Sequence, residues 1–108
     1  MKIQFLYSKD CPSHEEALQR VRKAIQEEGV HCDVTVINVE TIEQAEKFHF
    51  VGSPTILIDG HDIDPADNRP VHYALTCRAY TLEDGRISPL PSIAMIRKAL
   101  RAAAGKQP

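Results

Sequence analysis

The feature that most constrains the fold is an alternation of strand-like and helix-like segments in the first half of the chain. Residues 2–7 form a short apolar run typical of a buried strand, and residues 32–39 form a second run rich in β-branched side chains. Between them, residues 13–28 repeat apolar side chains with the period of an amphipathic helix. This order favours a right-handed crossover that pairs the two strands in parallel, so the sequence predicts an α/β fold.

Short capping patterns predict where the helices begin and end. Ser13 and Glu16 are spaced as a capping box at the start of the first helix, and Gly29 suits a left-handed residue after its last turn. Thr41 and Gln44 repeat the capping-box spacing and open a short second helix. The side chains expected to face inward from this second helix are Ile42, Ala45 and Phe48.

The second half of the chain begins with a hairpin pattern. Residues 55–58 predict a third strand, and the two-residue turn Asp59-Gly60 predicts that residues 61–63 return antiparallel to it. Residues 64–76 are rich in proline, aspartate, asparagine and arginine and predict a loop. It is long for a small domain, and loops of this length are often functional.

A second hairpin and a final helix complete the predicted order. Residues 77–82 and 86–87 flank a Glu-Asp-Gly turn, which predicts a small hairpin, and residues 92–104 have the period of a helix. The 108 residues are enough for one hydrophobic core and too few for two, so we expect residues 1–108 to form a single domain.

Charge and apolar run lengths exclude several classes of protein. The net charge of −2 indicates neither a nucleic-acid partner nor an anionic membrane surface, and no run approaches the roughly 18 apolar residues of a membrane span. The apolar run at the N-terminus is too short for a signal peptide, so we expect a cytoplasmic protein. Three cysteines argue against a framework of structural disulfides.

Cys11 is the candidate nucleophile because it lies where the first strand ends and the first helix begins. The positive end of a helix dipole stabilises a thiolate, and Pro12 suits the first helical turn. His14 follows one turn later and could hydrogen-bond the thiolate or donate a proton. The alternatives are that Cys11 is a small buried hydrophobe at a helix start and that His14 is a solvated first-turn residue.

The other two cysteines have different expected roles. Cys32 begins the second strand, and a helix of about 16 residues places it roughly 24 Å from Cys11, beyond the reach of a disulfide, so we expect Cys32 to be structural. Cys77 follows a strand that returns toward the Cys11 end of the sheet, where it could act as a second thiol with Arg78 stabilising its thiolate. The alternative for Cys77 is a buried residue of the second hairpin.

No spacing of residues predicts a metal site or a bound cofactor. The acidic residues Asp62, Asp64 and Asp67 lack the glycine and glutamate of a calcium-binding loop. His61 and His72 have no zinc-ligand spacing to the cysteines.

The order β-α-β-α-β-β-α, with a Cys-Pro-Ser-His motif at residues 11–14, resembles the thioredoxin-like superfamily. In that family the motif is Cys-x-x-Cys, and residues 52–55, Gly-Ser-Pro-Thr, look like its cis-proline loop, which lies against the reactive cysteine. Residues 58–63 are similar to the third and fourth strands of glutaredoxins. The resemblance implies a four-stranded mixed sheet with helices on both faces and a cis bond before Pro54. The loop and small hairpin of residues 64–88 would be an insertion before the last helix.

The motif departs from the family at His14, which replaces the second cysteine, so a local dithiol cannot form. The chain also resembles a group of small bacterial thioredoxin-like proteins, some of them linked to mercury resistance. A fainter similarity is to organomercurial lyase, which has an acidic residue three positions after its first cysteine, where this chain has His14.

These observations predict a thiol–disulfide oxidoreductase that reacts through a mixed disulfide with a small thiol such as glutathione, a protein disulfide or a thioredoxin-type reductant. The alternatives are a protein that holds soft metals or organomercury on the same thiolates, and a thioredoxin-fold module without chemistry. The expected catalytic residues are Cys11, His14 and Cys77, and the expected substrate-binding residues are Pro12, Ser53, Pro54 and Arg78.

Overall fold

The computed structural model describes residues 1–9, 13–64 and 79–105. Its nine elements follow the predicted order and confirm an α/β fold. They are β1 (Lys2–Tyr7), α1 (His14–Glu28), β2 (Asp33–Asn38), α2 (Ile42–Phe48), β3 (Thr55–Ile58), β4 (His61–Asp62), β5 (Tyr80–Thr81), β6 (Ile87–Ser88) and α3 (Ile93–Gly105). No helix within these ranges is long and apolar enough to cross a bilayer.

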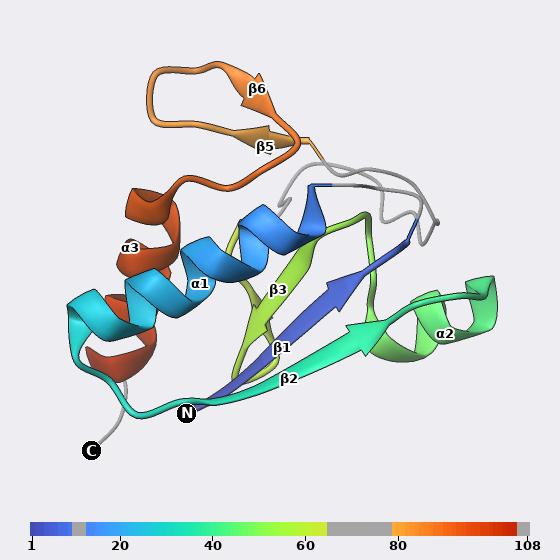
Figure 1. The fold of residues 1–108 in the computed structure, drawn as a ribbon, viewed down its shortest axis with the longest axis horizontal. Helices are drawn as coiled ribbons and strands as arrows, with labels where there is room; N and C mark the ends of the chain where they lie inside the picture. The colour runs from blue at the N-terminus through green and yellow to red at the C-terminus, as the bar shows by residue number, and fades with distance from the viewer. Residues whose placement is uncertain (10–12, 65–78, 106–108) are drawn as a thin grey trace.

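Four strands form one mixed sheet in the order β2-β1-β3-β4 (Figure 1). β1 pairs in parallel with β2 from Lys2↔Asp33 onward, which confirms the predicted crossover. β3 runs antiparallel to β1, with Ile3 opposite Ile58, and β4 runs antiparallel to β3. The C-terminal end of β1 therefore lies beside the start of β3.

Helices cover both faces of this sheet, as the family resemblance implies. α1 and α3 pack together on one face (Figure 1), over buried side chains from alternate positions of β1 and β3. This larger core consists of Ile3, Phe5, Ala17, Val21, Ala24, Ile56, Ile58, Ile96 and Leu100. The smaller core on the other face includes a side chain of α2 and consists of Leu6, Val39, Ala45, Phe50 and Leu57.

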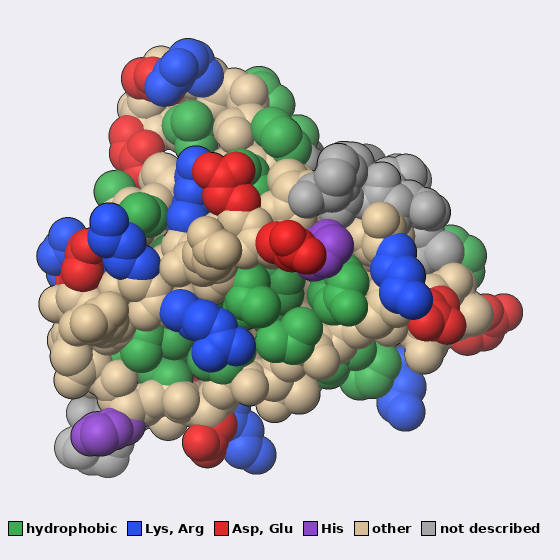
Figure 2. All heavy atoms as spheres, viewed as in Figure 1, with side chains coloured by type: hydrophobic (Ala, Val, Ile, Leu, Met, Phe, Trp, Pro, Cys, Tyr) green, Lys and Arg blue, Asp and Glu red, His purple; other side chains and the backbone are tan. Residues whose placement is uncertain are grey.

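The edge strand β2 is only partly covered. Val36 lies opposite Phe5 in the parallel ladder, yet Phe5 is fully buried and Val36 is 43% exposed. Figure 2 shows apolar side chains gathered in the middle of this face of the molecule, with charged side chains around them. α1 therefore lies over the centre of the sheet and leaves its β2 edge accessible.

The helix caps confirm two predictions and correct a third. Gly29 is left-handed (φ 65°), and Thr41 and Gln44 form the expected capping box around an extended Thr41 backbone. Ser13 precedes α1, but its side chain makes no capping hydrogen bond, so the Ser13–Glu16 box is wrong. The reason is its helical backbone (φ −79°, ψ 0°), because a capping side chain normally requires an extended residue.

α2 contacts the sheet through its middle and last turns. Ala45 is fully buried and Phe48 packs against the smaller core, as predicted. Ile42 is 46% exposed, so its predicted inward orientation is wrong. It lies in the first turn of a seven-residue helix and does not join the smaller core.

Both predicted hairpins are present. Asp59 and Gly60 have positive φ angles of 49° and 84°, the conformation of a tight two-residue turn that matches the twist of its strands. The second hairpin joins β5 to β6 through the predicted turn. The predicted loop over residues 64–76 lies outside the described residues except at Asp64.

Ion pairs join the last turn of α1 to α3. Arg97 Nε lies 2.7 Å from Glu28 Oε2, and Arg101 Nε lies 2.8 Å from Glu28 Oε1. Arg97 also pairs with Glu27 at 3.2 Å. The Arg101 and Arg97 guanidinium groups hold the pKa of Glu28 below its ordinary value.

Candidate functional site

The described residues include only part of the predicted site. His14, Ser53 and Pro54 are described, whereas Cys11, Pro12, Cys77 and Arg78 lie outside the described residues. The described three come together at the C-terminal end of β1, beside the start of β3. We call this region the proline end of the sheet, and it is defined by Tyr7, Ser8, His14 and residues 52–55.

A hydrogen bond ties the end of β1 to the loop that precedes β3. Leu6 lies opposite Thr55 in the antiparallel ladder, which brings Ser8 close to Ser53. The Ser8 N–H donates to Ser53 Oγ at 3.0 Å, and both residues are buried. Since Ser8 is three residues before Cys11 in the sequence, this bond fixes the chain that leads into the predicted nucleophile.

The loop itself is held by its own hydroxyl groups. The Ser53–Pro54 bond is cis, as predicted. Thr55 Oγ1 donates to the Gly52 carbonyl at 2.5 Å, across the proline. Gly52 has a φ of 140°, a conformation that favours glycine over other residues.

The second hairpin is attached to this loop from outside the sheet. Tyr80 in β5 is fully buried, and its hydroxyl donates to the Pro54 carbonyl at 2.5 Å. Tyr80, which belongs to the predicted insertion, thus contacts the proline end directly.

His14 opens α1 at the same end of the sheet. Its ring stacks on Tyr7, with centroids 4.4 Å apart and planes inclined by 15°. The residue is half-buried. The stack joins the last residue of β1 to the first residue of α1, the two elements that precede and follow residues 10–12.

Cys32 lies at the opposite end of β1, next to Met1. Its half-buried thiol lies 3.6 Å from the Met1 Sδ, and burial raises the pKa of the Cys32 thiol. A thiol with a raised pKa is mostly protonated at neutral pH and is a poor nucleophile. This environment agrees with the predicted structural role.

Sequence reasoning missed the residues that hold the proline end together. Ser8, Ser53 and Thr55 are the buried polar residues of the described ranges, and only Ser53 was predicted to belong to a site. The signal for Ser8 and Thr55 was weak but present, since hydroxyl residues directly follow the first strand and flank Pro54. Tyr80 gave no signal, because its partner Pro54 is 26 residues away.

The described part of the site can position a reacting group and supply an imidazole. The hydroxyls of Ser53, Thr55 and Tyr80 are engaged with the backbone, and His14 supplies a ring that can donate or accept a proton. Over residues 1–9, 13–64 and 79–105, no three histidine, cysteine or acidic side chains are grouped as metal ligands.

Searches of family models, curated proteins and solved structures find no match to this chain.

Proposed function

We propose that this chain is a thioredoxin-like thiol–disulfide oxidoreductase with Cys11 as its nucleophile. The observation that carries the proposal is the hydrogen bond from Ser8 N–H to Ser53 Oγ, which fastens the chain leading into Cys11 to the Pro54 loop. The four-stranded mixed sheet with helices on both faces is the arrangement that the family resemblance implies, and it supports the same assignment.

Activation of Cys11 rests on its place before α1. Helix N-termini lower thiol pKa values, and the 15-residue α1 begins three residues after Cys11. His14 opens the same helix, with its ring oriented by Tyr7. In the proposed reaction it hydrogen-bonds the thiolate or donates a proton to the leaving thiolate.

The reaction proceeds by two exchange steps. The Cys11 thiolate attacks one sulfur of a disulfide, a Cys11 mixed disulfide forms, and the other sulfur leaves as a thiolate that takes up a proton. A second thiol then attacks the Cys11 sulfur and releases the bound half as a thiol. Cys77 is the proposed second thiol, and a small thiol such as glutathione is the external alternative. In either case the substrate disulfide is reduced and two thiols are oxidised to a disulfide.

Selective alkylation tests the proposed nucleophile. Iodoacetamide at pH 7 should modify Cys11 at least about tenfold faster than Cys32, because the first thiolate is stabilised by the helix and burial opposes the second. Mass mapping of the cysteine peptides over time measures both rates in one sample. Equal rates, or faster reaction of Cys32, would contradict the activated thiol.

Turnover distinguishes the exchange reaction from a merely reactive cysteine. With 2-hydroxyethyl disulfide as the substrate and glutathione as the reductant, Cys11→Ser should abolish activity and Cys32→Ser should leave it near the native rate. Cys77→Ser separates the two resolving routes. Trapping of a Cys11 mixed disulfide in that variant assigns resolution to Cys77, and unchanged turnover assigns it to glutathione.

A further inference from the structure

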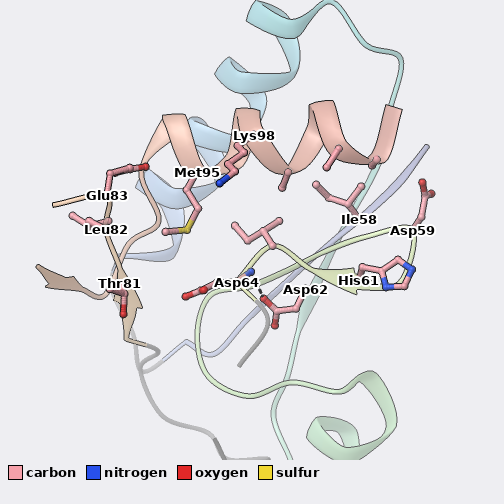
Figure 3. Close-up of a pocket in the computed structure, with 14 residues that line it drawn as sticks. Ile58, Asp59, His61, Asp62, Asp64, Thr81, Leu82, Glu83, Met95 and Lys98 are labelled. Carbon is pink, nitrogen blue, oxygen red and sulfur yellow. Dashed lines mark hydrogen bonds between the residues drawn. The ribbon is translucent and has the colours of Figure 1, made fainter. Parts of the chain in front are cut away.

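A cavity of about 860 Å³ lies between α3 and the β3–β4 hairpin, with residues of the β5–β6 hairpin at one end (Figure 3). Its volume falls in the range of ligand-binding sites in proteins. His14, Ser53 and Pro54 do not line it, so this groove is distinct from the described part of the candidate thiol site.

One long side of the groove is an apolar stripe of α3. Its residues recur at the spacing of a single helix face, while Ile96 and Leu100 on another face of α3 are buried in the larger core. Ile58 and Ile63 lie on the opposite side of the groove. The α3 residues of the stripe are Met95, Ala99, Ala102 and Ala103, and the three alanines leave room for a ligand backbone.

The rim of the groove is predominantly acidic. Among the described residues, Asp59, Asp62, Asp64 and Glu83 line it together with Lys98 and His61. Four carboxylates against one ammonium group give the lining a negative balance. The groove therefore combines an apolar floor with a rim that favours positive charge.

Hydrogen bonds hold several of these carboxylates in place. Asp59 Oδ1 accepts from the Lys2 N–H at 2.8 Å, and Asp62 Oδ1 accepts from the Asp64 N–H at 2.9 Å. Glu83 Oε1 accepts from Ser92 Oγ at 2.6 Å, which lowers the pKa of Glu83 and keeps it ionised at neutral pH. The charges are therefore preorganised around the groove.

The distance between the acidic groups at the two ends of the groove sets the length of a ligand that can contact both. Glu83 lies near Met95 at one end and Asp59 lies at the other, with the apolar stripe between them (Figure 3). Ala103 follows Met95 in α3 by eight positions, a rise of about 12 Å, which about four residues of an extended chain would span.

We propose that this groove binds an extended segment of a partner protein that carries apolar side chains between lysines or arginines. The apolar side chains lie against the α3 stripe, and the basic groups at either end meet Glu83 and Asp59. Charge complementarity selects this occupant over an acidic or uniformly apolar segment.

Two synthetic hexapeptides test the charge requirement. Both are acetylated and amidated and have two central leucines, flanked by two lysines on each side in one and two glutamates on each side in the other. Calorimetric titration of the full chain should show binding of the lysine peptide and at least about tenfold weaker binding of the glutamate peptide, with the difference shrinking as salt rises. Equal binding of the two peptides would overturn the proposal.

Matched variants test the location, because a chain of net charge −2 could attract a basic peptide anywhere. Ala102→Arg adds an exposed cation and a bulky side chain in the groove, and Ala104→Arg adds the same group to the same helix outside it. Binding of the lysine peptide should weaken at least about tenfold in the first variant and change less than about twofold in the second. An equal loss of peptide affinity in both variants would show that the peptide does not bind in the groove.

A charge-only variant and a test of self-association complete the experiment. Asp59→Asn with Asp62→Asn keeps the oxygen acceptors for Lys2 and Asp64 and should weaken peptide binding about fivefold. If the peptide does not bind while Ala102→Arg abolishes self-association in sedimentation, the groove joins two copies of the chain and the proposal is wrong.

Discussion

The two ends of the sheet are stabilised in different ways. At the proline end, the polar contacts include three hydrogen bonds of buried, uncharged side chains, because the Ser53, Thr55 and Tyr80 hydroxyls each bond the backbone of another residue. At the opposite end, the two helices α1 and α3 are joined by ion pairs between Glu28 and the partly exposed side chains of Arg97 and Arg101. We call this region the Glu28 end.

The comparison indicates where the chain carries functional constraint. A buried polar group is costly unless it is bonded, so buried hydroxyls are rarely the simplest way to stabilise a core. They fix the backbone in one arrangement, and at the proline end that backbone leads into Cys11. Surface ion pairs contribute little and vary with pH and salt, which suits a region that only joins two helices.

The largest expected effect comes from Ser53→Ala. This change leaves the buried Ser8 N–H without its acceptor and should lower the free energy of unfolding by about 2 kcal/mol. Ser13→Ala is the matched control, because the Ser13 side chain caps no helix, and it should cost about 0.5 kcal/mol or less. Urea unfolding measures both, and equal losses would show that the Ser53 bond is not special.

A smaller effect is expected for Tyr80→Phe, which keeps the ring and removes the donor to the Pro54 carbonyl. The free energy of unfolding should fall by about 1 kcal/mol. Thr81→Val, at the neighbouring exposed position of the same strand, should change it by less than about 0.5 kcal/mol. The same urea titrations distinguish them. If the free energy of unfolding did not fall in Tyr80→Phe, the bond between the hairpin and the Pro54 loop would not contribute to stability.

The smallest effect, and the only one of the three that depends on pH, belongs to Glu28→Gln. Arg101 and Arg97 lower the pKa of Glu28 in the folded state, so this carboxylate stabilises the fold at neutral pH. The contribution disappears as the pH falls from about 4.5, the ordinary value, through the lowered folded pKa. The native and variant stabilities should therefore differ most near pH 7 and converge in acid.

The salt dependence of the stability loss, compared between Glu28→Gln and Ser53→Ala, provides the control for this pH effect. The loss in Glu28→Gln should shrink in high salt, whereas the loss in Ser53→Ala should not, because neutral buried hydrogen bonds are not screened. Urea unfolding at two salt concentrations tests the contrast. If salt reduced the stability loss in Ser53→Ala as strongly as the loss in Glu28→Gln, the two ends of the sheet would not differ in how they are stabilised.

Features that depend on neighbouring residues could be predicted from the sequence. The Thr41–Gln44 box and the Asp59-Gly60 turn each lie within four residues, and the structure has both. Ser13 shows the limit of this reasoning, because the right residue types were present but the backbone was helical rather than extended. Ile42 shows another limit, since a short helix need not cover the sheet along its whole length.

The candidate site could be predicted only in outline. The Pro54 loop and its cis bond followed from a motif, whereas the bonds that fix the loop depend on strand register and on a hairpin distant in the sequence. The register of β1 against β3 decides that Ser8 meets Ser53, and no local pattern encodes it. The acidic groove is similar, because it is built from three elements that are separated along the chain.

The position of β1 has a consequence for the order in which the fold can be completed. β1 is synthesised before β2 and β3, yet it lies between them, and its partner Ile58 follows Ile3 by 55 residues. The larger core also needs Leu100 of the last helix. The ribosome must therefore release the chain through Ile58 before both edges of β1 are covered, and until then that strand exposes the backbone groups on which another chain could pair.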